Sequence, residues 1–104
     1  MFGAFRTEWY QKKFNKLSAG EQNRVVKIEQ DLKQNPYSSK PLSYMFFREK
    51  KFNGKRMYFL VYEEHKVVFL VTISDKKAQQ NVIDLIEANL DVYKEQLESI
   101  LKNI

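Results

Sequence analysis

Positively charged side chains gather in one stretch of this sequence, residues 40–56. The stretch holds six Lys or Arg residues against one acidic residue, Glu49, which gives it a charge of +5. Such a local excess raises the electrostatic potential where an anionic partner, above all a phosphate backbone, would dock. The alternative is that lysines keep an exposed edge strand soluble, and charge alone does not choose between the two.

Cations of this kind can cleave RNA. A base takes the proton of a 2′-OH, Arg and Lys side chains stabilise the pentavalent phosphorane, and an acid protonates the leaving 5′-oxygen. Arg48 and Lys50 lie two residues apart on an expected strand, so they should share one face of it. Arg56 opens the next strand and is expected close to them across a tight turn. Lys76 and Lys77 follow the last strand, where either a ligand or solvent is their partner.

The sequence offers few residues for other kinds of site, such as metal centres or covalent catalytic sites. Tyr44, Tyr58 and Tyr62 could stack on bases or move protons, although half-buried packing with a wet hydroxyl is the commoner role of such rings. His65, the only histidine, falls in an expected turn with no second ligand at metal-binding spacing. The chain also lacks cysteine, a Gly-rich phosphate loop and paired acidic residues at strand ends. We therefore expect neither a metal site nor a cofactor.

The composition is that of one globular domain spanning residues 1–104. Apolar residues make up 43% and charged residues 30%, with only three Gly and two Pro, which favours a packed core over disorder. The absence of cysteine fits the reducing cytoplasm. The N-terminal residues lack the apolar region of a signal peptide, and no apolar run approaches the ~20 residues of a membrane helix. We expect a cytoplasmic protein without membrane contact.

Two helices are expected in the first third of the chain, after a weak strand at about residues 2–7. Apolar residues at helical spacing predict the first helix over residues 8–17. Ser18 and Glu21 form a capping-box pattern that starts the second helix. Asn35-Pro36 ends it, because the residue before a proline resists the helical conformation. A helical hairpin of this kind must bury its apolar stripe against another layer.

The strands that follow supply that layer and give an α+β fold. Asn53-Gly54 lies between two apolar-rich runs and predicts a tight hairpin, because a type I′ turn needs two positive φ angles. Met57–Tyr62 and Val67–Ile73 are apolar on both faces, so both faces should be covered. We expect a small antiparallel sheet made of a three-strand meander and the N-terminal strand, with the helical hairpin packed on it.

One long C-terminal helix is expected over about residues 76–103. Its apolar residues recur every three or four positions from Val82 to Ile104, with Ser74-Asp75 as the cap. A helix of that length outreaches a small sheet, so its far end either meets a partner or folds back along the helical hairpin. A homodimer through this helix is one expectation, with contacts at Leu97, Ile100 and Leu101.

The order of elements and several short motifs resemble the RelE/ParE toxin superfamily. The resemblance covers about residues 2–86 and is carried by Leu32–Pro36, Lys40–Leu42, Phe47–Lys50, Asn53–Arg56, Lys66–Val71 and Ser74–Lys77. RelE-like members are metal-independent endoribonucleases that cut messenger RNA in the ribosomal A site. The resemblance thus implies a toxin that inhibits translation, with mRNA and the ribosome as partners.

The resemblance also implies roles for individual residues. By position, Arg48 and Lys50 resemble the strand cations that bind phosphate and assist proton transfer, and Arg56 resembles the arginine that stabilises the transition state. Lys77 stands where the family usually has a second arginine, which keeps the charge and loses the bidentate fork. Ile83 stands where some members have a tyrosine base. Further RNA contacts are expected from the neighbours of these cations: Lys51, Lys55, Tyr58 and Lys76.

Two alternatives share the fold. ParE-like members inhibit DNA gyrase and need none of these catalytic residues, and the missing tyrosine at Ile83 keeps that alternative open. A third alternative is a non-catalytic relative that binds only RNA or a protein partner. For a toxin of either kind, the resemblance implies a cognate antitoxin whose amphipathic segment covers apolar grooves and neutralises the cations.

Overall fold

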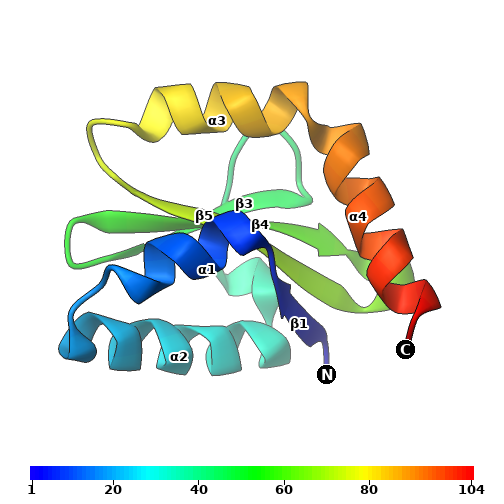
Figure 1. Ribbon diagram of the computed structural model, residues 1–104, viewed down its shortest axis with the longest axis horizontal. Helices are drawn as coiled ribbons and strands as arrows, with labels where there is room; N and C mark the ends of the chain where they lie inside the picture. The colour runs from blue at the N-terminus through cyan, green and yellow to red at the C-terminus, as the bar shows by residue number, and fades with distance from the viewer.

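A five-stranded sheet runs through the middle of the molecule, and helices cover both of its faces (Figure 1). The structure is a computed structural model that describes residues 1–104. The strands are β1 (Gly3–Arg6), β2 (Lys40–Pro41), β3 (Phe47–Phe52), β4 (Lys55–Tyr62) and β5 (Val67–Asp75). Their order across the sheet is β1-β5-β4-β3-β2. The α+β class and the β3-β4-β5 meander are as the sequence predicts.

The N-terminal strand makes the sheet mixed instead of antiparallel. β1 pairs in parallel with β5, in the register Gly3↔Val67 to Arg6↔Leu70. Parallel strands need a long connection between them, and the whole chain between Arg6 and Val67 provides one. The two-residue β2, which the sequence analysis did not identify, pairs with β3 at the outer edge. Pro41 has no backbone N–H to donate. It is tolerated in β2 because an edge strand pairs on one side only, and the missing N–H can be on the solvent side.

The helical hairpin covers one face of the sheet. It consists of α1 (Glu8–Asn15) and α2 (Ala19–Gln34). The Ser18 side chain accepts from the backbone of Glu21, whose own side chain reaches back to the Ser18 backbone, so the predicted capping box is present. The predicted stripe of α2 is buried with Tyr10 of α1 against apolar side chains of the strands: Val25, Ile28 and Leu32.

The turn between β3 and β4 determines which side chains face which layer. Asn53 and Gly54 have φ angles of 47° and 75°, as the type I′ prediction requires. The two-residue loop pairs Phe52 with Lys55 and Lys51 with Arg56. Because successive side chains alternate between faces, every residue of β3 and β4 is thereby assigned to one layer.

The C-terminal segment forms two helices where the sequence predicts one. These are α3 (Gln79–Ala88) and α4 (Leu90–Lys102). At the break, Asn89 has φ −124° and ψ 22°, and its side-chain amide donates to Leu85 O at 2.8 Å. An asparagine amide that binds the preceding turn competes with helix continuation. The start also differs from the predicted residue 76, because Asp75 Oδ1 accepts from Ala78 N and closes a turn ahead of the helix.

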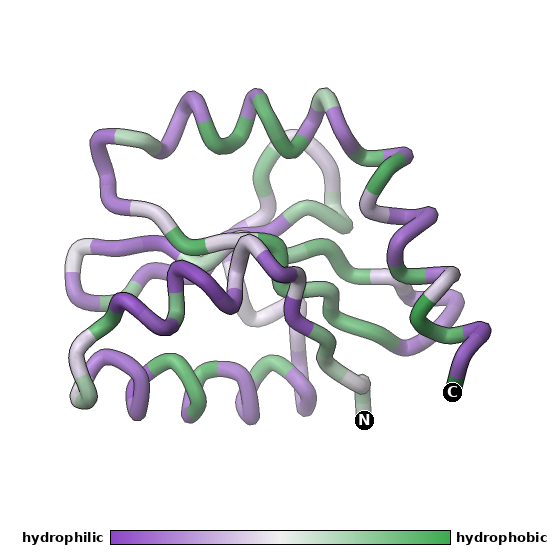
Figure 2. Tube along the Cα trace, viewed as in Figure 1, coloured by the Kyte–Doolittle hydropathy of each residue, from purple (hydrophilic) through white to green (hydrophobic).

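The bend brings α4 back over the second face of the sheet. Leu97 is fully buried and Tyr93 nearly so, in a core shared with α3 and the strands. Hydrophobic residues are concentrated in the middle of the sheet, whereas the end of the sheet at the β3–β4 turn is hydrophilic, and the two kinds alternate along the helices (Figure 2). Within the chain, the apolar seam therefore packs on the sheet instead of extending past it, and Leu97 is not available to a partner. None of the four helices combines the length and hydrophobicity needed to cross a bilayer.

Candidate functional site

The expected catalytic cations of β3 and β4 lie on opposite faces of the sheet. Arg48 and Lys50 pair with Phe59 and Met57, which belong to the core beneath α1 and α2. Arg56 pairs with Lys51 and lies on the face covered by α3 and α4. The expectation that Arg48 and Lys50 lie close to Arg56 across the turn is therefore wrong. A two-residue hairpin loop places the odd-numbered residues of β3, not the even ones, beside Arg56.

Arg48 is buried and fully engaged by its own chain. It is 3% exposed, and its guanidinium donates four hydrogen bonds. The acceptors are Ser39 Oγ at 3.0 Å, Met45 O at 2.9 Å, Tyr37 O at 3.1 Å and Ser39 O at 2.6 Å. An arginine has five N–H donors, so little capacity remains for a phosphate. Arg48 fastens the segment before β3 to the sheet.

Arg56 is largely buried, and its side chain makes no hydrogen bond or ion pair. It is 7% exposed, and its Nε is a buried donor that makes no hydrogen bond. No carboxylate lies within ion-pair distance of its guanidinium, whereas Lys55 beside it binds Glu21 at 2.6 Å. Burying a charged group without a partner is costly unless the site holds a ligand of opposite charge. A guanidinium also has the geometry to bind two phosphate oxygens at once.

Exposed lysines lie at the same end of the sheet as this unpaired arginine. Lys51 is its cross-strand neighbour and is exposed. Lys76 and Lys77 follow β5 directly, at the end of the sheet where Lys55 pairs with Asp75. Both are exposed. Lys51, Lys76 and Lys77 thus lie at the same end of the sheet as Arg56, although they come from different parts of the chain.

The remaining expected site residues are placed differently. Tyr58 is 0% exposed and its hydroxyl lies 2.9 Å from Ser74 Oγ, so its ring cannot stack on a base. Burial raises the pKa of the Tyr58 phenol above its ordinary value, which keeps it neutral. Ile83 packs against the core beneath α3 and α4. Lys50 is half-buried at the edge of the sheet.

One residue that the sequence analysis did not consider as a site residue belongs to the same face. Glu49 has a side chain that is 0% exposed, and its Oε2 accepts from Gln79 Nε2 of α3 at 3.0 Å. Its Oε1 makes no hydrogen bond, and Lys40 Nζ lies 3.9 Å away. Counting back two residues at a time from Lys51 would have placed Glu49 beside Arg56, because the turn type specifies the register.

A shallow depression of about 280 Å³ opens beside Glu49. Its lining contains three cations, two hydroxyls and the buried carboxylate: Ser38, Ser39, Lys40, Glu49, Lys50 and Lys51. The depression lies at the β2–β3 edge, and Lys51 connects it to Arg56 on the same face. Lysines around a small polar hollow are suited to an anionic ligand.

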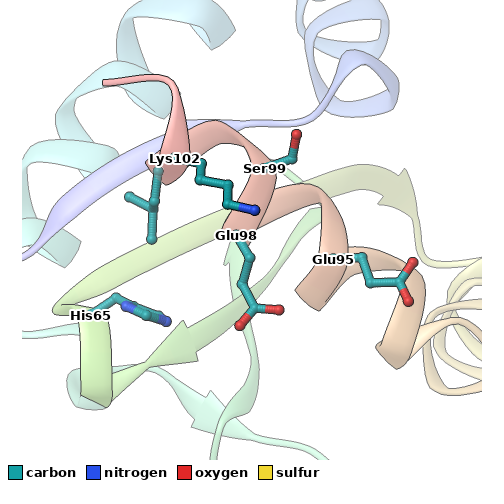
Figure 3. A pocket seen from close by; sticks show the side chains of 6 residues that line it. His65, Glu95, Glu98, Ser99 and Lys102 are labelled. Atoms are coloured by element: carbon teal, nitrogen blue, oxygen red, sulfur yellow. The ribbon is translucent and has the colours of Figure 1, made fainter.

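A larger depression at the opposite end of the sheet has different chemistry. It lies between the β4–β5 turn and α4, has a volume of about 650 Å³, and is shown in Figure 3. Its polar lining includes His65, Glu95, Glu98 and Lys102. This lining lacks the concentration of lysines found beside Glu49. No three His, Asp or Glu side chains gather anywhere in a metal-binding arrangement.

Comparison with solved structures identifies the architecture. A mutant E. coli RelE toxin in the free state matches with a TM-score of 0.72 at 16% identity, over 84% of this chain and 96% of that one. The chain has the fold of the RelE toxins. The intact E. coli RelBE toxin–antitoxin complex matches with a TM-score of 0.66 at 19% identity, over 72% of this chain and 96% of that chain.

A third solved structure, a RelBE complex from Mycobacterium tuberculosis, matches this chain with a TM-score of 0.65 at 19% identity. That match covers 72% of this chain and 98% of that one. The sequence itself matches no family model and no curated protein. At such low sequence identity, a shared fold indicates the same architecture but not the same activity. The activity depends on the residues of the site.

Proposed function

We propose that this chain is a RelE-type toxin that cuts messenger RNA on the ribosome and thereby stops translation. The observation that carries the proposal is Arg56, a largely buried arginine whose side chain makes no hydrogen bond or ion pair within its own chain and whose Nε is a buried, unbonded donor. Exposed lysines lie at the same end of the sheet, and the fold is that of proteins described as RelE toxins. A phosphodiester supplies the anionic partner that Arg56 lacks, and the lysines lengthen the track for the RNA backbone.

The four cations that the resemblance implies as catalytic have different roles in the proposed site: Arg48, Lys50, Arg56 and Lys77. Arg56 binds the scissile phosphate and stabilises the charge that develops on it in the transition state. Lys77 and Lys51 supply further positive charge around it. Lys50 contacts the RNA at the edge depression. Arg48 holds the backbone before β3 in place and does not touch the substrate, because its donors are already engaged.

A cognate antitoxin is part of the proposal. The fold neighbours from E. coli and M. tuberculosis were solved as toxin–antitoxin complexes. A small acidic protein would neutralise the positive charge around Arg56 and block RNA. The expected homodimer has less support, because the central residue of its contact, Leu97, is buried within the chain.

Cell-free translation tests the function. The purified wild-type chain should arrest synthesis, and Arg56→Ala should restore it. Lys12→Ala is the matched control, because Lys12 is an exposed cation on α1 paired only with Glu8. Continued arrest by Arg56→Ala would contradict the proposal.

The alternatives predict other results in the same preparation. A gyrase inhibitor leaves translation running and blocks DNA supercoiling. A module that only binds RNA shows salt-sensitive affinity without translational arrest.

A further inference from the structure

We infer that Glu49 is the proton acceptor of this site, taking the proton from the 2′-hydroxyl of the nucleotide that is cut. The inference rests on the proposed function and deepens it, because it names the base and restricts the substrate to RNA. The sequence analysis found no base at Ile83. Neither the resemblance nor the matched structures assign a role to Glu49.

The hydrogen bonding of the Glu49 carboxylate leaves one oxygen free. Its side chain is completely buried, and Oε2 is held by Gln79 Nε2 at 3.0 Å. Its Oε1 has no donor within hydrogen-bond distance. Buried carboxylate oxygens normally accept hydrogen bonds, so a free one needs an explanation. A general base provides it, because its oxygen must accept a proton from the substrate.

The surroundings of Glu49 match a ribonucleotide. The side chain lines the depression of about 280 Å³ with Lys40 and Lys51, and Arg56 lies on the same face of the sheet. Ligand pockets for whole drug-sized molecules are ~300–1,000 Å³, so this hollow suits part of one nucleotide. Cations bind the phosphate oxygens, whereas a carboxylate repels them and binds a hydroxyl. DNA lacks that hydroxyl.

Access to Oε1 depends on Lys40. Its ammonium lies 3.9 Å from Oε1, beyond hydrogen-bond distance, and its side chain is 64% exposed. A phosphate that enters the depression offers Lys40 a stronger partner, so the lysine moves outward and uncovers the carboxylate. Gln79 keeps the other oxygen in place throughout, which orients Oε1 toward the incoming hydroxyl.

In the cleavage step, Glu49 takes up one proton and Lys51 releases one. The 2′-O–H bond breaks and its proton passes to Glu49 Oε1, while the 2′-oxygen forms a bond to phosphorus. Arg56 stabilises the phosphorane oxygens. The P–O5′ bond breaks, and the leaving 5′-oxygen takes a proton from the Lys51 ammonium. The products are a 2′,3′-cyclic phosphate and a 5′-hydroxyl, and proton exchange with water returns Glu49 and Lys51 to their starting states.

Glu49→Gln is the test, because the glutamine oxygen can still accept the bond from Gln79. We expect cleavage to fall by about 10²- to 10⁴-fold, the usual contribution of a general base, with RNA binding unchanged or slightly tighter.

Two controls make the outcome decisive. A substrate with a single 2′-deoxy nucleotide at the cut should be bound and left intact. If Glu49→Gln does not fold, Gln79→Ala carries the test, because it removes the hydrogen bond that holds the other oxygen of Glu49, and undiminished cleavage by that variant overturns the inference. Cleavage by Glu49→Gln within threefold of wild type, with Arg56→Ala inactive, refutes the base and leaves the toxin proposal standing. A wild-type chain that cuts no RNA refutes both.

Discussion

Replacing Arg48 by alanine tests whether this arginine supports the fold or the chemistry. The guanidinium is 3% exposed and donates four hydrogen bonds, three of them to backbone carbonyls. It also lies over the ring of Tyr37, with Cζ 5.2 Å from the centroid. No other side chain connects the backbone of residues 37–45 to β3 through so many contacts.

The expected loss of stability in Arg48→Ala follows from those four hydrogen bonds. Hydrogen bonds that involve a charged group contribute about 1.5–3 kcal/mol each, and neutral ones about 1 kcal/mol. Part of the loss returns when water reaches the carbonyls of Tyr37 and Met45, which belong to exposed residues. We expect Arg48→Ala to lower the free energy of unfolding by about 3–5 kcal/mol, the contribution of four such hydrogen bonds less the part that water restores.

Urea unfolding followed by circular dichroism measures this difference, read from the transition midpoint at constant slope. The matched control is Lys50→Ala, on the same strand and face, since the Lys50 side chain makes no hydrogen bond or ion pair. Its effect should stay within about 0.5 kcal/mol. Unfolding of Arg48→Ala within 1 kcal/mol of wild type would refute the structural role of this arginine. Loss of RNA cleavage by such a stable variant would assign Arg48 to the chemistry instead.

Three further predictions concern the second face of the sheet. Leu97→Ala should cost about 2–5 kcal/mol of stability because the side chain is fully buried, whereas the exposed Val92→Ala should cost little; equal effects would mean that α4 does not pack on the sheet. Tyr58→Phe should cost about 1 kcal/mol through the lost bond to Ser74 and leave RNA affinity unchanged, and a large loss of affinity would show that the ring reaches the RNA. Burial raises the pKa of Tyr62 from 10.0 to about 12, so the folded state favours the neutral phenol and loses this stabilisation as pH rises from 10 to 12; Tyr62→Phe should make alkaline unfolding less steep over that interval, and an unchanged slope would argue against it.

Local signals in the sequence predict the helical hairpin and the β3–β4 turn well. The capping box at Ser18 and the positive φ angles at Asn53-Gly54 depend on neighbouring residues alone, so they survive in the tertiary structure. The assignment of cations to faces failed although the turn contained the information. A two-residue loop pairs Lys51 with Arg56, and a one-residue slip moves every side chain to the other face.

Other features depend on contacts that no local pattern shows. The break at Asn89 occurs without Pro or Gly, and burial of Leu97 on the sheet accompanies it. Arg48 looks like a free cation in the sequence because its four acceptors are mainly backbone carbonyls, which every residue has. Glu49 looks like a solvated acid on an edge strand. Its burial becomes visible only when Gln79 of α3 is placed above it.

Mapping the 5′ ends of a transcript on programmed ribosomes tests the central claim most directly. The wild-type chain and Lys12→Ala should produce the same new ends within the coding region. Arg56→Ala should reduce these ends by about 10²-fold or more, the loss expected when one donor to the transition-state charge is removed. Intact transcripts with the wild-type chain, or undiminished cutting by Arg56→Ala, would contradict the claim that this unpaired arginine binds and activates a phosphodiester of RNA.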